Sequence, residues 1–283
     1  MRTDTVSHEG LTLGVLLAGD PAKPAIVLLH GWPHSKELYA PVMEALAAHH
    51  HVLAFDLPAI GDSRGAPPSA EKTILADIVI GAAERAGARS ILIAGLDVGG
   101  MIAYAAARDH GRRIAGAVVM NTVIPGIDPW DKVLADPRIW HFAFHALPDL
   151  PELLVTGHQR PYFDFFTDFL AGNKEAVTEQ HRAVFARAYE RPEALKAGFD
   201  WYRALQADAK HNSRHKEIDT PMLYLRGDAD GRSPDDYLPA LKAAGAQQIK
   251  GEVLRGSGEF APLEVPEAFT RAMASFAKAC QAR

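Results

Sequence analysis

The stretch AGLDVGG, residues 94–100, indicates most clearly how this chain folds. It completes the apolar run SILIAGLD, residues 90–97, and leads into a helical pattern over residues 99–110. A short, continuously apolar run ended by a turn signal is typical of a buried strand. Because the glycines allow a sharp turn, the stretch predicts a strand, a tight turn and a helix, with Asp97 exposed at the turn. A plain glycine-rich turn with an aspartate at the helix N-terminus is the alternative interpretation.

The same alternation of strand and helix runs through most of the chain. Strands that are apolar throughout, rather than at every second residue, indicate a parallel sheet covered on both faces. The sequence therefore predicts an α/β fold with a doubly wound, mostly parallel sheet. The further strand-like runs are residues 25–31, 51–58, 114–121, 221–230 and 249–258, and the helical patterns cover residues 37–48, 72–86, 99–110, 235–244 and 264–280.

The alternation stops between about residue 124 and residue 218. This segment is helical in its periodicity, rich in aromatic residues and without strand-like runs. We interpret it as a helical cap inserted into a core that forms the sheet. The expected organisation is a first part of the core, residues 1–123, the cap, residues 124–218, and a second part of the core, residues 219–283.

Composition narrows the class of protein. The chain has 283 residues, of which 48% are hydrophobic and 23% charged, as in ordinary globular proteins. A net charge of −5 gives no reason to expect a nucleic-acid partner. The single cysteine, Cys280, excludes a disulfide within the chain and a cysteine-based metal site. The polar N-terminus and the lack of a long apolar run predict a cytoplasmic protein with no membrane partner. The sequence also allows a homodimer.

Three motifs occur along the chain in an order that is typical of one family. The first is a strand followed by HGWP, residues 30–33, and the second is FDLPAIGDS, residues 55–63, which resembles D-x-P-G-x-G-x-S with Ala59 for the usual glycine. The third, GLDVG at residues 95–99, has the form of a nucleophile elbow with aspartate in place of serine. In order and spacing, over nearly its whole length, the chain resembles the α/β-hydrolase fold family. The branch it resembles contains epoxide hydrolases and haloalkane dehalogenases, which use an aspartate nucleophile.

The resemblance implies roles for residues of the core. Asp97 would be the nucleophile, and the backbone N–H groups of Trp32 and Val98 would form the oxyanion hole. The segment YLRGDADG ends a strand and places Asp230 where the family has its charge-relay acid. Some relatives take this acid from the end of the preceding strand, but that position is Asn121 here, so Asp230 is favoured.

The resemblance extends to two segments of the cap. WHFAFHALPDLPELLVTG, residues 140–157, places His141 where related enzymes carry a His or Tyr that contacts the leaving oxygen or halide. FDWYRAL, residues 199–205, places Tyr202 at the second such position. The pair could polarise an epoxide oxygen and supply its proton. The alternative is an aromatic helix face that only packs on the core.

The choice of branch depends on residues around the nucleophile. Haloalkane dehalogenases usually have a tryptophan where this chain has Val98, and fluoroacetate dehalogenases have arginines where it has Val98 and Met101. Phe142, expected to contact the substrate, stands where the latter have a halide-binding tryptophan. The resemblance therefore favours an epoxide hydrolase that needs no cofactor or metal and acts on a neutral, apolar small molecule. A dehalogenase is an alternative.

The chain departs from the family at Glu259, in RGSGEFAPLEVPEAF, residues 255–269, where relatives have the catalytic histidine. Carboxylates ionise near pH ~4.3 and imidazole near ~6.5, so glutamate is the weaker base at neutral pH. In one hypothesis Glu259 has a raised pKa and is a slower but working base. In a second, ester hydrolysis is lost, leaving a ligand-binding pseudoenzyme or a non-hydrolytic epoxide-opening catalyst. In the third, least favoured hypothesis, Asp97, Asp230 and Glu259 hold a divalent metal.

Overall fold

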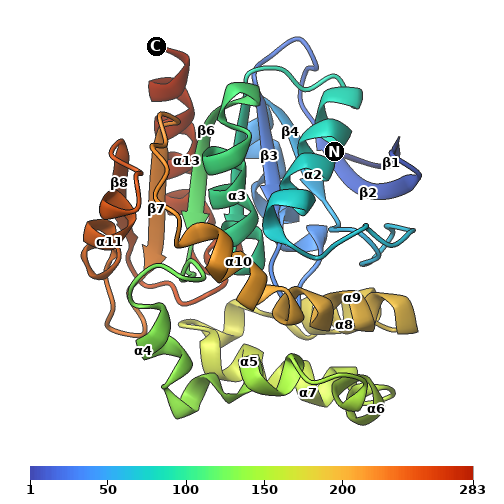
Figure 1. Cartoon of the computed structure of the whole chain (residues 1–283). Helices are drawn as coiled ribbons and strands as arrows, with labels where there is room; N and C mark the ends of the chain where they lie inside the picture. The colour runs from blue at the N-terminus through green and yellow to red at the C-terminus, as the bar shows by residue number, and fades with distance from the viewer. Residues whose placement is uncertain (283) are drawn as a thin grey trace.

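A single eight-stranded sheet forms the centre of the molecule in the computed structural model, which describes residues 1–282 (Figure 1). The strand order is β1-β2-β4-β3-β5-β6-β7-β8. The six strands β4, β3, β5, β6, β7 and β8 lie in this order, and neighbours among them pair in parallel. The pairs β1 with β2 and β2 with β4 are antiparallel. The predicted mostly parallel α/β sheet is confirmed. The strands are β1 (Arg2–His8), β2 (Leu11–Ala18), β3 (Ala25–Leu29), β4 (His51–Phe55), β5 (Ile91–Leu96), β6 (Ile114–Met120), β7 (Met222–Gly227) and β8 (Ile249–Leu254).

The N-terminal hairpin of β1 and β2 is the part of the sheet that the sequence did not predict. Strand β1 reads RTDTVSH, and its residues alternate between exposed and partly buried positions. It lies at the edge of the sheet and pairs only with β2. An edge strand with one face in water needs no continuous apolar run, so the pattern that revealed the central strands is missing in β1. Strand β2 reads LTLGVLLA and is almost entirely buried, so its apolar run was an available signal.

Helices cover both faces of the sheet and bury a separate apolar core on each. On one face α2 and α3 pack on Val27, Ile93 and Val119, and on the other α1 and α13 pack on Ile26 and Leu28. Adjacent residues of one strand point to opposite faces, which explains why these strands are apolar throughout. The helices of the core are α1 (Ala40–Ala47), α2 (Lys72–Arg85), α3 (Val98–Asp109), α11 (Leu238–Ala243), α12 (Ala261–Glu264) and α13 (Pro266–Gln281).

A layer of helices between β6 and β7 lies across the carboxyl ends of the parallel strands (Figure 1). We call it the insert. No strand occurs between Met120 and Met222, so the alternation stops where the sequence indicated. The boundaries at residues 124 and 218 stay predictions, and the predicted second core part, 219–283, ends one residue beyond those described. The insert contains α4 (Trp130–Leu134), α5 (Trp140–His145), α6 (Leu150–Val155), α7 (Gln159–Leu170), α8 (Glu179–Ala188), α9 (Pro192–Arg203) and α10 (Leu205–Asn212).

Buried polar contacts fix the insert on the core. The ammonium group of Lys72, at the start of α2, lies 2.8 Å from the Asp208 carboxylate and donates to the Trp201 carbonyl at 2.6 Å. Both charged side chains are buried, so loss of either partner would leave an unpaired charge. Arg191 donates to three carbonyl groups of the loop that follows β4. These contacts hold the insert in one orientation above the strand ends.

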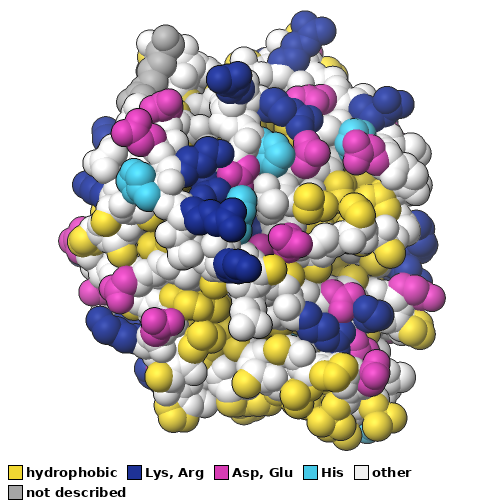
Figure 2. All heavy atoms as spheres, in the orientation of Figure 1, with side chains coloured by type: hydrophobic (Ala, Val, Ile, Leu, Met, Phe, Trp, Pro, Cys, Tyr) yellow, Lys and Arg dark blue, Asp and Glu magenta, His cyan; other side chains and the backbone are white. Residues whose placement is uncertain are grey.

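The outer face of the insert exposes apolar side chains, which gather along the bottom of the molecule in Figure 2. Within residues 1–282, no helix is both long enough and apolar enough to cross a membrane. The large exposed hydrophobic residues of the insert are Leu134, Trp140, Leu147, Leu150, Leu153, Leu154, Phe165 and Phe169.

Candidate active site

The turn between β5 and α3 holds Asp97 in a strained backbone conformation. Its φ of 53° and ψ of −120° are rare for a residue with a side chain. A Cβ atom at Gly95 would lie 1.9 Å from the carbonyl oxygen of Gly99, and one at Gly99 would lie 2.3 Å from that of Leu29. Only glycine fits at these two positions, because backbone atoms fill the space that a side chain would need. The sequence motif and the geometry therefore agree on a nucleophile elbow.

Two backbone amides point at the Asp97 carboxylate. The N–H of Trp32 donates to Oδ2 at 2.8 Å, and the N–H of Val98 donates to the same carboxylate. The two residues predicted to form an oxyanion hole thus meet at Asp97. Burial raises the pKa of Asp97 to about 6, although these two hydrogen bonds act to lower it. At neutral pH the side chain is mainly a carboxylate, as a nucleophile must be.

His30 holds the loop that carries Trp32. The ring is fully buried, and its Nδ1 lies 2.8 Å from the carbonyl oxygen of Gly31. Its Nε2 accepts a hydrogen bond from the N–H of Leu57 at 3.0 Å. Burial lowers the pKa of His30, which keeps the ring neutral, with one donor and one acceptor nitrogen. This histidine therefore positions a donor of the site and does not face the cavity.

Glu259 lies on the loop after β8, and the surrounding backbone is tightly held. Its N–H donates to the Leu170 carbonyl at 3.0 Å, which ties the loop to the insert. Burial, and next the negative charge of Asp97, raise the pKa of Glu259 well above its usual value. The ionised form of Glu259 is therefore disfavoured while Asp97 carries its negative charge.

Asn121 is a positioning residue that the sequence did not single out for this role. Its side-chain amide donates to the carbonyls of Gly258 and Glu259, at 3.0 and 3.1 Å. Its Oδ1 accepts from the N–H of Gly227 at 2.9 Å. Asn121 thereby joins the end of β6 to the end of β7 and to the loop of Glu259. Its place at the end of a predicted strand, where some relatives carry the acid, was the available signal.

Asp230 lies in the lining of the same cavity, but its carboxylate is engaged elsewhere. It forms an ion pair with the guanidinium group of Arg226 and accepts from the backbone N–H of Arg232 at 3.1 Å. Its side chain is half exposed. The charge-relay role of Asp230 stays a prediction, since its ionic partner is an arginine and not the residue at position 259.

The insert contributes an aromatic wall to the cavity. His141, Phe142 and Tyr202 all line it, together with the Trp32 ring. The His141 and Tyr202 rings are 6.0 Å apart, and the Phe142 and Tyr202 rings 5.2 Å apart. Burial lowers the pKa of His141 to about 4 and raises that of Tyr202 well above 10. Both side chains are therefore neutral hydrogen-bond donors across the physiological pH range.

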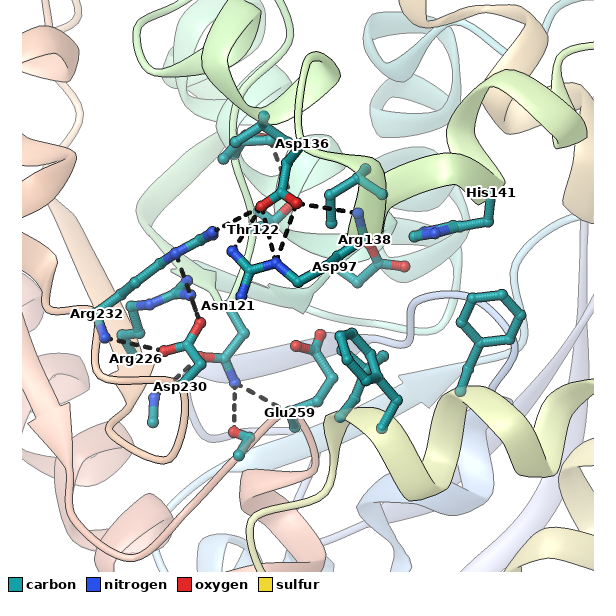
Figure 3. A pocket seen from close by; sticks show the side chains of 18 of the residues that line it. Asp97, Asn121, Thr122, Asp136, Arg138, His141, Arg226, Asp230, Arg232 and Glu259 are labelled. Carbon is teal, nitrogen blue, oxygen red and sulfur yellow. Dashed lines mark hydrogen bonds and ion pairs between the residues drawn. The ribbon is translucent and has the colours of Figure 1, made fainter.

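The cavity has a volume of about 420 Å³, large enough for a small organic molecule. Figure 3 shows the carboxyl groups of Asp97 and Glu259 facing its interior, with His141 on one side. Three arginines that the sequence did not indicate lie on the other side, Arg138, Arg226 and Arg232. They come from two segments far apart in the sequence, the insert and the end of β7 with the loop after it, so no single motif brings them together. No group of three or more His, Cys, Asp or Glu side chains within residues 1–282 could hold a metal ion, so the hypothesis of a three-carboxylate metal site has no geometric support.

Sequence comparison assigns the chain to a family. The family described as alpha/beta hydrolase fold matches residues 24–266, which is most of the chain. The protein therefore belongs to the α/β-hydrolase fold family, a family of hydrolases, as its elbow and sheet predicted.

Individual relatives place the chain near epoxide hydrolases. It is 26% identical over 281 residues to the soluble epoxide hydrolase of Corynebacterium sp. (strain C12), covering 94% of this chain and 95% of that protein. It is 26% identical to epoxide hydrolase 4 of Mus musculus, over 80% of this chain and 65% of the other. Among solved structures, Cfl2 from Burkholderia cenocepacia is 28% identical and superposes with a TM-score of 0.83, covering 97% of this chain and 94% of that one. The predicted resemblance to the epoxide hydrolase branch is confirmed.

Proposed function

We propose that the protein is an epoxide hydrolase that acts through an ester of Asp97. The observation that carries this proposal is the Asp97 carboxylate at a strained elbow, held by the backbone amides of Trp32 and Val98 at the floor of a partly aromatic cavity. The relatives named as epoxide hydrolases support the same general function.

The first step is opening of the epoxide. A carboxylate oxygen of Asp97 attacks a ring carbon, a carbon–oxygen bond of the epoxide breaks, and a hydroxyalkyl ester forms. The epoxide oxygen takes its proton from Tyr202 or His141, which are neutral donors on the wall above Asp97. The apolar side chains of this wall, Phe142 among them, hold the carbon skeleton of the substrate.

The second step is hydrolysis of the ester, with Glu259 as the base. Glu259 takes a proton from water as the water attacks the ester carbonyl, and the two backbone amides stabilise the resulting oxyanion. Collapse of the intermediate breaks the bond between the ester carbonyl carbon and the oxygen of the substrate, which releases the diol and restores the Asp97 carboxylate. The proton that Glu259 took from water then passes to the donor that protonated the epoxide oxygen. This restores the donor and returns Glu259 to the ionised form in which it acted as the base.

The proposal explains how a carboxyl with a raised pKa can serve as a base at the right moment. The charge of Asp97 is one of the two main causes of the raised pKa of Glu259. Formation of the ester removes that charge, so the pKa of Glu259 falls in the intermediate. Glu259 therefore ionises more readily in the state that needs a base than in the free enzyme, although burial still opposes its ionisation.

The experiment that tests this function is a single turnover of a neutral epoxide in water enriched in ¹⁸O, followed by mass analysis of the peptide that contains Asp97. Attack of water on the ester carbonyl places the label in the Asp97 carboxyl and leaves the first diol unlabelled. Label in the diol alone would mean that water opens the epoxide directly, and the ester mechanism would be wrong. Asp97→Asn, which lacks the nucleophile, is the control.

A second candidate function is opening of the epoxide without hydrolysis of the ester. The observation that favours it is the buried carboxyl of Glu259 at the position of the base, because burial opposes its ionisation and a carboxylate is a weaker base than a histidine. Under this alternative the protein is alkylated once and then stalls, or it catalyses a non-hydrolytic opening. Repeated turnover to the diol, with more product than enzyme, excludes it.

A further inference from the structure

One wall of the cavity carries a chain of alternating charges. The insert supplies Asp136 and Arg138, and the end of β7 with the loop after it supplies Arg226, Asp230 and Arg232. Arg138 contacts Asp136 at 2.6 Å, and Arg232 reaches Asp136 at 3.8 Å and Asp230 at 3.9 Å. Arg226 closes the chain with its ion pair to Asp230. In Figure 3 this group, which we call the arginine wall, lies on the side of the cavity away from His141.

The charges of the arginine wall do not balance. Its three arginines contact only two aspartates, Asp136 and Asp230, so one positive charge of the wall has no carboxylate partner of its own. The nearby Glu259 forms no ion pair with these arginines among residues 1–282, and burial disfavours the ionised form of its carboxyl. Asp97 supplies a third carboxylate on the opposite side of the cavity, so the attraction for an anion is local to Arg232. Its guanidinium group lies 3.8 and 3.9 Å from the nearest carboxylates, beyond hydrogen-bond distance, and can donate to a negatively charged ligand.

Arg226 is the most constrained member of the arginine wall. Its side chain is only 8% exposed, and its guanidinium carbon lies 4.9 Å from the centre of the Tyr237 ring. Its Nε–H is buried and has no hydrogen-bond partner among the residues that the structure describes. A buried cation with an unused donor is costly to the fold unless something compensates for it. The ion pair with Asp230 and the face of the Tyr237 ring provide that compensation, so Arg226 holds the arginine wall in place.

We propose that the arginine wall binds a carboxylate of the substrate, so that the preferred substrate is a short-chain epoxy carboxylic acid. This inference rests on the function proposed above. A single loosely paired guanidinium group, that of Arg232, suits a monoanion, and its planar shape suits a carboxylate. The volume of about 420 Å³ limits the distance between this group and the epoxide. The expectation of a neutral substrate rested on the residues after Asp97, whereas these arginines come from other segments.

The test compares a short epoxy acid with its neutral methylamide, using the wild-type protein and Arg232→Gln. Arg232 is chosen because its side chain is 35% exposed, so its removal disturbs the fold less than that of Arg226. We expect a kcat/KM at least about tenfold higher for the acid in the wild type, and a loss of most of that preference in the variant, mainly through KM. Arg112→Gln, an exposed arginine outside the cavity lining, changes the net charge equally and should keep the preference.

Two results would overturn the inference: equal kcat/KM values for acid and methylamide in the wild type, or an equal loss for both substrates in Arg232→Gln. The second would mean that Arg232 only holds the insert against the core. Binding of the unreactive cyclopropane analogue of the acid, measured by calorimetry, separates this inference from the proposed function. Binding that weakens in Arg232→Gln supports the arginine wall even without turnover, and no binding to the wild type rejects it.

Discussion

The two carboxyl groups of the site, Asp97 and Glu259, are held in different ways. Asp97 is fixed by backbone alone, through a positive φ angle, glycines without room for a side chain, and two amide donors. Glu259 lies on a loop that side chains and backbone from distant segments hold, among them Asn121 and the Leu170 carbonyl. The comparison teaches that the surroundings of the nucleophile follow from two short sequence motifs, residues 30–33 and 95–99, whereas the surroundings of Glu259 come from scattered residues that belong to no motif.

The largest expected effect concerns Glu259, the proposed base for hydrolysis of the ester. Glu259→Gln should leave the formation of the Asp97 ester intact but slow its hydrolysis by about 10²-fold or more, since the base is lost. Glu259→His should accelerate that hydrolysis at pH 7, because imidazole ionises nearer to neutrality. The measurement is rapid-quench mass analysis of ester formation and decay. Glu252→Gln, an exposed residue outside the cavity lining, is the charge-matched control. Unchanged ester decay in Glu259→Gln would remove Glu259 from the mechanism.

The next effect sharpens the claim that backbone geometry alone shapes the elbow. A methyl group at Gly95 would overlap the Gly99 carbonyl oxygen, only 1.9 Å from the added carbon, so Gly95→Ala should destabilise the fold by about 3 kcal/mol. The control is Gly87→Ala, at a φ of +87° with no atom within 4 Å of the added carbon. That change should cost only about 1 kcal/mol, for the backbone conformation. Urea denaturation measures both, and equal losses would mean that steric fit at the elbow is unimportant.

The smallest effect is a pH dependence that separates the two halves. Only ionised Asp97 attacks, and its pKa is raised to about 6. Ester formation should therefore fall about tenfold per unit as the pH drops below 6 and be level above it. Ester hydrolysis depends instead on ionised Glu259, whose pKa burial still raises in the ester, so its rate should rise with pH through a midpoint of its own. Single-turnover rates from pH 4.5 to 9 test this, and one shared midpoint for both steps would contradict the separation.

The sequence predicts well whatever depends on neighbouring residues. The central strands, the glycines around Asp97 and the amides of Trp32 and Val98 all follow from short motifs, because a tight turn restricts the residues that can form it. The edge strand β1 was missed, since one of its faces meets water and its apolar pattern is weak.

Other features of the site could not be predicted, because they arise when distant segments meet. The arginine wall combines residues nearly one hundred positions apart, Arg138 and Arg232, and neither belongs to a motif. Asp230 occupies the expected position after β7, but its orientation is set by an ion pair with Arg226. Periodicity and spacing locate a residue on an element, whereas the partner of a charged side chain depends on the packed structure.

The central claim is that Asp97 attacks an epoxide and forms an ester. The most direct test is the intact mass of the protein over time, after mixing with a reactive neutral epoxide at pH 7, with Asp97→Asn in parallel. We predict an increase by the mass of the substrate in the wild type, its absence in the variant, and decay of the adduct as diol appears. No adduct in the wild type under rapid quench, or an equal adduct in Asp97→Asn, would contradict the account.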